Sequence, residues 1–295
     1  MSPCLLIINP HAGRGTGTRL GEAMAGHLRA AGLRCEARFT RAPQEATELA
    51  EAAARAAAPA VIVAGGDGSV FEAVNGLVRA GHHTTALGVI PIGTGNDFVK
   101  MLGIPRDWKA ACDRIVASER RLVDIGRCNG RYFANGVGIG FDAQVALEAN
   151  RLPFLHGTAV YAAALIKTLL LRYSTPTVRI EHDGGVREGK ITLVAAANGR
   201  CYGGAFRIAP EARIDDGLLE LAIADRLSRF GILRLVPHVL AGTHAGKPGV
   251  TMLRTRRLRV TSRTPLVVHA DGEIIEQEAT HVEVEILPRA LAVLC

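Results

Sequence analysis

Residues 61–69, VIVAGGDGS, combine features that suit the binding of a phosphate group. An apolar β-branched run is followed by Gly65, Gly66 and Gly68, and the next residues repeat apolar side chains at helical spacing. This order predicts a strand, a glycine turn and a helix. A helix that begins after such a turn directs unpaired backbone N–H groups and the positive end of its dipole at one point, where an anion binds well.

Asp67 lies inside this turn and limits the chemistry. A carboxylate beside a phosphate repels it unless a metal ion or a hydroxyl group lies between them, so Asp67 indicates magnesium or an activated hydroxyl. The simpler interpretation is an ordinary tight turn in which Asp67 caps the helix. The segment alone leaves both interpretations open.

Two further loops have the same design. NPHAGRG at residues 9–15 and PIGTGNDF at residues 91–98 each follow an apolar run and contain glycines before a helical pattern. The carboxyl ends of parallel strands meet at one edge of a sheet, where ligands bind, so we expect the loops to lie together. Thr94 could then donate its hydroxyl to a phosphate or a metal-bound water, and Asp97 would lie near Asp67. Capping of the next helix by Asn96 or Asp97 is the simpler alternative.

Acidic residues also occur at glycine-rich turns in the later part of the chain. FANGVGIGFDAQV at residues 133–145 contains Asp142 among glycines that predict bulges or close backbone approach. At Asp216, before a glycine, an Asx turn and a metal bound by carboxylate and carbonyl oxygens are equally good interpretations. In the segment HADGE, Asp271 before glycine is a strong hairpin signal, but a hairpin does not explain Glu273.

The elements that must hold these residues change in character near Val123. The chain before it alternates strand and helix patterns, with strands expected at residues 4–9, 33–39, 61–63, 86–90 and 121–128 and helices at 20–31, 43–58, 71–78 and 105–117. After it, helices are scarce except at residues 161–171, and short alternating runs dominate: residues 132–137, 178–182, 190–197, 218–224, 258–261, 266–269 and 281–287. We therefore predict an α/β domain with a parallel sheet over residues 1–123 and an all-β, sandwich-like domain over residues 124–287, with a C-terminal tail, 288–295, that could return to the first domain.

Composition narrows the class of partner. The 295 residues, 48% hydrophobic and 21% charged, suit a globular protein, and the net charge of +7 favours nucleotide phosphate, an acidic membrane surface or nucleic acid. Nucleic acid is the weakest of these, because only 4% of residues are aromatic and no zinc-finger spacing occurs. Six cysteines without any C-x-x-C pair suit reduced thiols in the cytosol. The apolar segment 159–171 contains Lys167 and is too short to span a bilayer, so it is expected to be a buried or membrane-facing helix.

A basic segment offers a second possible contact with anions. Arg254, Arg256, Arg257, Arg259 and Arg263 could meet anionic lipid headgroups. A solvated strand face is the commoner explanation for such a run.

The ordered set NPHAGRG, GGDGS, PIGTGNDF, FANGVGIGFDA, APEARIDDGLLEL and HADGE resembles the diacylglycerol kinase catalytic family, in particular its soluble bacterial lipid-kinase branch. The resemblance covers essentially the whole chain. NAD kinases and phosphofructokinases have loops similar to GGDGS, but GTGND followed much later by DGE is more specific. Ser69 stands where many relatives have threonine, which keeps the hydroxyl, and the residues around 151–175, expected to shape lipid access, match no motif.

The resemblance implies transfer of the γ-phosphoryl group of ATP to a hydroxyl of diacylglycerol or a related lipid, in a cleft between an α/β nucleotide domain like that of NAD kinase and phosphofructokinase and a β-sandwich lipid domain. It implies that Asp67, Asp97 and Asp124 surround catalytic magnesium, and that Asp271 or Glu273 is the general base. The nucleotide would be bound by Asn9, Pro10, His11, Ala12, Gly13, Thr40, Gly65, Gly66, Asp67, Gly68, Ser69, Glu72 and Thr94. A second, structural magnesium would be bound by Asp216 and the backbone oxygens of Arg213 and Leu218.

The same resemblance sets the expected partners and place of action. They are ATP, Mg²⁺, a membrane lipid substrate and a peripheral membrane surface reached from the cytoplasm, without nucleic acid, and a homodimer is kept open. The alternatives are a kinase for a soluble acceptor such as NAD and a catalytically silent lipid- or nucleotide-binding regulatory protein.

Overall fold

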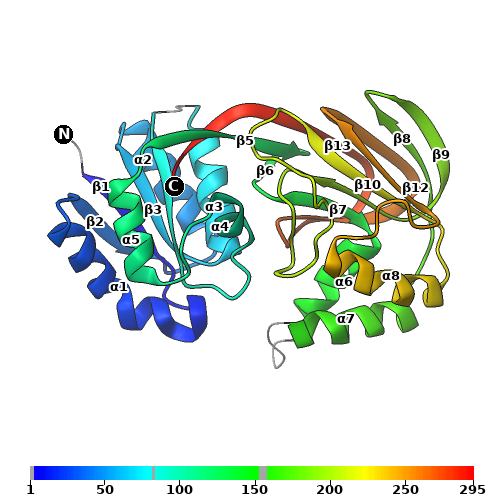
Figure 1. The fold of residues 1–295 in the computed structure, drawn as a ribbon, viewed down its shortest axis with the longest axis horizontal. Helices are drawn as coiled ribbons and strands as arrows, with labels where there is room; N and C mark the ends of the chain where they lie inside the picture. Colours follow the sequence, from blue (N-terminus) through cyan, green and yellow to red (C-terminus); the bar gives the residue numbers. More distant parts are fainter. Residues whose placement is uncertain (1–2, 82–83, 153–157) are drawn as a thin grey trace. The chain divides into compact units, whose positions relative to one another are not determined.

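The computed structural model describes residues 3–81, 84–152 and 158–295 and divides into two compact units (Figure 1). Unit 1 comprises Met1–Ile125 and Pro288–Cys295, and unit 2 comprises Gly126–Leu287. The last residues of the chain thus belong to the same unit as the first.

A parallel sheet forms the centre of unit 1. Its strands are β1 (Cys4–Ile8), β2 (Cys35–Phe39), β3 (Ala60–Gly65) and β4 (Ala86–Pro91), in the order β4-β3-β1-β2, and the end of β13 (Glu273–Leu294) pairs in parallel with β4 through Val293 and Leu87. The helices are α1 (Ala12–Ala30), α2 (Glu45–Arg55), α3 (Asp67–Arg79), α4 (Asp97–Leu102) and α5 (Trp108–Ala117). Residues 13–15 at the start of α1 leave the helical conformation and form a loop.

The core of unit 1 explains the unbroken apolar runs in its strands. Leu6, Ile8 and Ile62 pack in one buried cluster with Met24 of α1 and Ile115 of α5. Ile7, Val61 and Val63, which alternate with them along the strands, are also fully buried, because helices cover both faces of the sheet. Strands buried in this way are hydrophobic at every position rather than at alternate positions.

Unit 2 is built mainly of antiparallel strands. They are β6 (Arg131–Phe133), β7 (Gly136–Gly140), β8 (Thr177–His182), β9 (Gly185–Ala197), β10 (Leu219–Asp225), β11 (Val250–Thr255), β12 (Arg257–Ala270), the first part of β13 and the last residues of β5 (Arg120–Cys128), a strand that begins in unit 1. The order is β11-β10-β9-β7-β12-β13, and β8 pairs with both β9 and β12.

In the described part of unit 2, three helices accompany these strands, and the sequence patterns predicted only one of them. The expected helix at residues 161–171 lies within α7 (Thr158–Leu171), whereas α6 (Phe141–Ala149) and α8 (Arg229–Ala241) were missed. The glycine-rich residues before α6 suggested bulged strand, and Pro237 lies inside α8 where it interrupts a helical pattern. A start signal for α8 exists in Ser228, whose hydroxyl accepts a hydrogen bond from the Gly231 N–H.

Apolar side chains of all three helices pack in one buried cluster, and polar contacts join the helices as well. Figure 1 shows α6, α7 and α8 as ribbons. Glu148 of α6 is almost fully buried and binds Lys167 of α7 at 2.7 Å and Arg151 at 2.8 Å, and the hydrogen bond from Lys167 holds the pKa of Glu148 below its usual value. Arg229 of α8 donates a hydrogen bond to the backbone oxygen of Leu169. None of the helices in the described parts of the chain is both long and apolar enough to cross a membrane.

Candidate active site

The loops that follow β1, β3 and β4 meet at the carboxyl ends of these strands in unit 1. The Asn9 side chain donates a hydrogen bond to the Ser69 hydroxyl at 2.9 Å, which joins the first loop to the second. The second and third loops touch at Gly66 and Gly93: a Cβ atom on Gly93 would lie 2.5 Å from the Cα atom of Gly66. Glycine is required at this contact because the two backbones leave no room for a side chain.

The other residues predicted to bind nucleotide lie in or beside these loops. Thr40 follows β2, and its N–H donates to the Ile8 oxygen; Thr94 is exposed in the third loop. Glu72 has a structural contact, because its carboxylate accepts hydrogen bonds from the N–H groups of Gln44 and Ala46 at the start of α2. The remaining predicted residues occupy the loop after β1 and the β3–α3 junction: Asn9, Pro10, His11, Ala12, Gly13, Gly65, Gly66, Asp67, Gly68 and Ser69.

Asp67 caps a helix, although not the one that follows it directly. The N-cap of α3 is Gly66, and the two Asp67 oxygens accept hydrogen bonds from the N–H groups of Asn96 and Asp97, at 2.7 Å and 2.6 Å, at the start of α4. Asn96 is the N-cap residue of α4, as the simpler alternative expected, but its side chain makes no capping hydrogen bond. Asp67 takes this role from a distant loop, which no local sequence pattern could indicate.

Asp67 and Asp97 form a buried pair of acidic residues. Burial and the nearby Asp97 carboxylate raise the pKa of Asp67, while the two backbone N–H groups act in the opposite direction. Lys100 binds Asp97 at 2.7 Å, and the side-chain oxygen of Asn96 is buried without a hydrogen-bond partner in the described structure. Carboxylate and amide oxygens are the ligands that Mg²⁺ prefers, so the oxygens of these three residues suit a divalent cation.

Asp124 is the third carboxylate predicted to surround magnesium. It is fully buried, and its carboxylate accepts a hydrogen bond from the Arg289 N–H at 2.7 Å. Across residues 3–81, 84–152 and 158–295, no three His, Cys, Asp or Glu side chains form a group that could hold a metal ion. The hydrogen bond from the Asp97 N–H brings Asp67 and Asp97 together, and a catalytic role for Asp124 stays a prediction.

At the predicted structural metal site, the structure has an Asx turn. The Asp216 carboxylate accepts a hydrogen bond from the Leu218 N–H at 3.1 Å, and Asp215 pairs with Arg213 at 3.6 Å. Asp216 is exposed. These contacts complete the turn without a cation, so the donor set gives no support for a metal and its presence stays a prediction.

The DGE segment forms the hairpin between β12 and β13. Asp271 and Gly272 have φ angles of 50° and 90°, and Ala270 pairs with Glu273, as in a two-residue type I′ turn. The Asp271 carboxylate accepts hydrogen bonds from three consecutive backbone N–H groups, those of Ala134, Asn135 and Gly136, at 2.7, 2.8 and 2.9 Å. Glu273 is exposed at the start of β13. Asp271 thus anchors the β6–β7 connection, and Glu273 is the more exposed of the two acidic residues.

An apolar cavity of about 120 Å³ lies within unit 2 beside this hairpin. Side chains of α6, α7 and α8 and of strands β9 and β10 line most of it, and Gly272 of the hairpin lines it too. Its few lining side chains with polar groups are Asp142, Tyr161, Thr192, Tyr202 and His269. The cavity therefore suits an apolar chain whose polar end lies near the DGE hairpin.

Asp142, Tyr202 and His269 form one polar group on the cavity wall. The Tyr202 hydroxyl donates a hydrogen bond to one Asp142 oxygen at 2.6 Å, and His269 Nε2 lies 3.5 Å from the same oxygen. Burial, followed by the Asp142 charge, raises the pKa of Tyr202 well above its usual value, so Tyr202 stays a donor. The other Asp142 oxygen is buried and has no hydrogen-bond partner among the described residues, which leaves it available to a donor on a bound molecule.

Gly138 makes this group possible. A Cβ atom at this position would lie 2.0 Å from an Asp142 oxygen and 2.3 Å from His269 Nε2. The glycine-rich sequence thus marks a close approach, as its pattern predicted, but the partners could not be read from it. Sequence reasoning missed Tyr202 and His269 as site residues; only the position of His269 two residues before Asp271 pointed to it.

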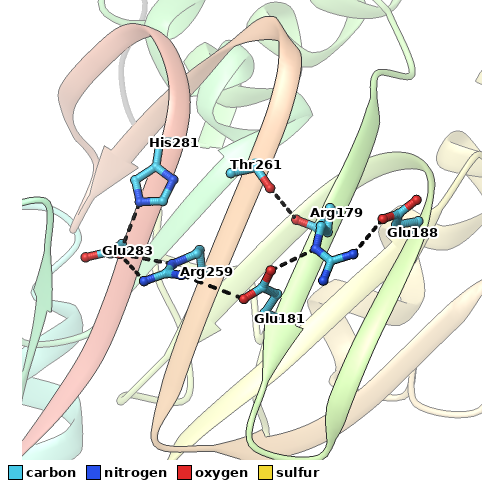
Figure 2. A network of polar contacts seen from close by, with 7 residues as sticks. All are labelled: Arg179, Glu181, Glu188, Arg259, Thr261, His281 and Glu283. Carbon is cyan, nitrogen blue, oxygen red and sulfur yellow. Dashed lines mark hydrogen bonds and ion pairs between the residues drawn. The ribbon is translucent and has the colours of Figure 1, made fainter.

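Two arginines of the basic segment on β11 and β12, Arg254 and Arg259, form ion pairs with glutamates. Arg259 lies 2.7 Å from Glu283 and 3.8 Å from Glu181, and Arg179 continues the network on β8 (Figure 2). Arg254 pairs with Glu220 at 2.6 Å. These arginines already have acidic partners, as on a solvated strand face.

The structure thus has two units, one with an α/β architecture around three glycine loops and one built mainly of antiparallel strands. Residues 3–128 match the model of the diacylglycerol kinase catalytic domain, and residues 135–295 match that of the YegS C-terminal NAD kinase beta sandwich-like domain. The chain therefore belongs to the diacylglycerol kinase catalytic domain family, and the resemblance seen in the motifs is confirmed.

Relatives along most of the chain agree with this assignment. A diacylglycerol kinase of Bacillus subtilis (strain 168) is 31% identical over 276 residues, covering 92% of this chain and 90% of the relative. A diacylglycerol kinase of Staphylococcus aureus (strain bovine RF122 / ET3-1) is 32% identical over 270 residues, covering 91% of this chain and 85% of the relative. A solved structure from Bacillus anthracis str. Sterne superposes with a TM-score of 0.82 at 26% identity, covering 99% of this chain and 96% of that one.

Proposed function

We propose that this protein transfers the γ-phosphoryl group of ATP to the hydroxyl of a lipid, with diacylglycerol or a related lipid as acceptor. The observation that carries the lipid assignment is the apolar cavity beside the DGE hairpin in a member of this family. An apolar chain would occupy the space between the helices, with its polar end at the hairpin. A soluble, highly polar acceptor such as NAD has no comparable use for such a cavity.

Unit 1 would bind the nucleotide. The glycine loops around Asn9, Gly66 and Gly93 present backbone N–H groups at the carboxyl ends of the strands, and the start of α3 adds a dipole that favours phosphate. Oxygens of Asp67, Asp97 and Asn96 are the groups that would hold magnesium. Bound there, the ion would neutralise the charge of the phosphates during transfer.

Glu273 is the better of the two candidates for the general base. Three backbone N–H groups already occupy the Asp271 carboxylate, so its charge is committed to holding the hairpin and the β6–β7 connection. Glu273 is exposed beside the same cavity wall that Gly272 lines, and its carboxylate could accept the proton of a lipid hydroxyl. Asp271 would then be a positioning residue.

The protein would act in the cytoplasm at a membrane surface, because its lipid substrate resides in a bilayer. Its six cysteines are free, which suits a reducing compartment. The net charge of +7 favours an anionic membrane.

Incubation with γ-labelled ATP and Mg²⁺, together with a panel of lipids in mixed micelles and NAD as a soluble competitor, tests this proposal. Label should appear in a lipid product and require the divalent ion. Label in NAD but not in lipid would identify a soluble-acceptor kinase. Binding of lipid and nucleotide without any labelled product would identify a silent binding protein instead.

A further inference from the structure

Exposed apolar side chains in unit 2 concentrate on two neighbouring helices. Among residues 3–81, 84–152 and 158–295, six of the eight exposed large hydrophobic side chains lie on α7 or α8. Leu170 and Leu171 are 68% and 70% exposed, and Phe230 is 66% exposed. We define the α7–α8 face as these six side chains: Ile166, Leu170, Leu171, Phe230, Leu233 and Leu240.

The spacing of these residues makes a continuous apolar surface on each helix. Ile166 and Leu170 are four positions apart on α7, and Phe230 and Leu233 are three positions apart on α8, with Leu240 two turns further. The opposite sides of both helices are apolar as well, because Leu165 and Leu169 of α7, like Ile232 and Val236 of α8, pack in the shared core. Each helix therefore has apolar side chains beyond those that the core buries, and these side chains favour a second apolar environment.

The charges on these helices have one sign. Neither α7 nor α8 contains Asp or Glu. Lys167 is bound by Glu148 of α6, but four arginines on or next to the two helices have no acidic partner within the described structure: Arg172, Arg226, Arg229 and Arg234. Arg234 lies over the ring of Phe230, with its guanidinium carbon 5.3 Å from the ring centre. Exposed arginines beside exposed leucines complement an anionic lipid surface, which offers acyl chains below a layer of negative headgroups.

The pattern distinguishes a bilayer from a second copy of the chain. A two-fold dimer through the α7–α8 face would bring its own arginines against one another, which is unfavourable. The strand surface around Arg259 provides the internal contrast. Arg259 and Arg179 are paired with glutamates (Figure 2). Among the described residues, β12 carries none of the exposed large hydrophobic side chains.

We propose that the α7–α8 face docks on an anionic bilayer and inserts its leucines and Phe230 among the acyl chains. This docking proposal rests on the proposed lipid kinase function, because it explains how the enzyme would reach a substrate in a membrane. The same helices line the apolar cavity with Tyr161 and Leu165 of α7 and Leu235 and Val239 of α8. When the protein docks through this face, the two helices that line the cavity are also the elements in contact with the bilayer.

Vesicle co-sedimentation of the full chain, without ATP, tests the docking. The vesicles contain either equal amounts of phosphatidylglycerol and phosphatidylcholine or phosphatidylcholine alone. We expect binding to the anionic vesicles that weakens in high salt. The double variant Leu170→Ser/Leu171→Ser should bind at least about tenfold more weakly, because burial of one leucine contributes that much or more. Arg234→Gln should weaken binding about fivefold, the effect of one charge near an anionic surface.

Matched controls come from the same unit. Val186 on β9 is 54% exposed and lies outside the face, so Val186→Ser should bind as the wild type does. Arg263→Gln removes an exposed arginine of β12 and should also leave binding unchanged. Far-UV circular dichroism checks that all variants remain folded.

Kinase assays separate this proposal from the proposed function. With a short-chain diacylglycerol below its micelle concentration, Leu170→Ser/Leu171→Ser should keep wild-type turnover, whereas its activity on vesicle-embedded lipid should fall with its binding. Vesicle binding that depends on these residues in a protein with no kinase activity would support docking and refute the function. Equal binding by the wild type and the double variant, or a lipid-free dimer that the double variant abolishes, would overturn the docking proposal.

Discussion

Replacement of Asp271 by asparagine should destabilise unit 2 rather than only impair chemistry. Asp271→Asn keeps one acceptor oxygen, which can still serve the N–H groups of Asn135 and Gly136, because both bond to the same Asp271 oxygen in the structure. The Ala134 N–H, which donates to the other oxygen, would face the N–H₂ group of the new amide. A hydrogen bond to a charged group contributes about 1.5–3 kcal/mol, so the loss of one bond and the weakening of two should lower the free energy of unfolding by about 2–4 kcal/mol.

Urea unfolding followed by far-UV circular dichroism measures this change, and the thermal midpoint should fall by roughly 5–15 °C for a unit of this size. Glu273→Gln is the matched comparison, because its side chain is exposed. It should unfold like the wild type but lose about 100-fold or more of kcat, the usual contribution of a general base. Wild-type stability in Asp271→Asn would refute the anchoring role. Full activity in Glu273→Gln would refute its assignment as the base.

Three further changes test other parts of the structure. Burial lowers the pKa of His244, so the stability that depends on the neutral imidazole is present above its unfolded pKa of about 6.5 and is lost as the pH falls below that value. In urea unfolding between pH 7.5 and 5, His244→Gln should therefore lose less free energy of unfolding than the wild type. The same dependence of this free energy on pH in both proteins would contradict the assignment. Gly138→Ala should lower the free energy of unfolding in urea by about 1–3 kcal/mol and raise KM for lipid, because the new methyl group collides with Asp142. An unchanged KM would argue against a role for the Asp142 carboxylate in lipid binding. Burial raises the pKa of Cys112 and of Cys128 to about 12, so iodoacetamide at pH 8 should label both only after denaturation, as measured by mass spectrometry; rapid labelling of the native protein would show that they are accessible.

Local signals accounted for the loops and most elements of unit 1. Gly66 and Gly93 were visible in the sequence because a backbone contact that excludes any side chain leaves glycine as the only choice. The strands β1, β3 and β4 were visible as unbroken apolar runs because both faces of the sheet are covered. In each case the structural requirement acts on one short segment, so the local sequence is enough to predict it.

The polar group on the cavity wall could not be predicted, because it depends on distant parts of the chain. Tyr202 lies 60 residues after Asp142, and His269 reaches the same carboxylate from another strand. Only the register of β7 with β12, in which Gly138 pairs with His269, brings these residues together. The same register places the Asp271 hairpin against the N–H groups of residues 134–136. A hairpin signal identifies the turn, but the role of its carboxylate is set by a neighbouring strand.

Asp67 shows why the capping and metal interpretations of a carboxylate need not compete. Each of its oxygens accepts one backbone N–H group from the start of α4, yet an ionised carboxylate has about four acceptor sites, so two remain. Those N–H groups fix the direction of the carboxylate, while the adjacent buried Asp97 charge raises the pKa of Asp67 and makes a nearby cation favourable. The Lys100 ammonium group, which binds Asp97, neutralises part of this negative charge. The cap therefore positions the carboxylate, and the acidic pair that results has the charge and oxygen donors of a divalent-ion site.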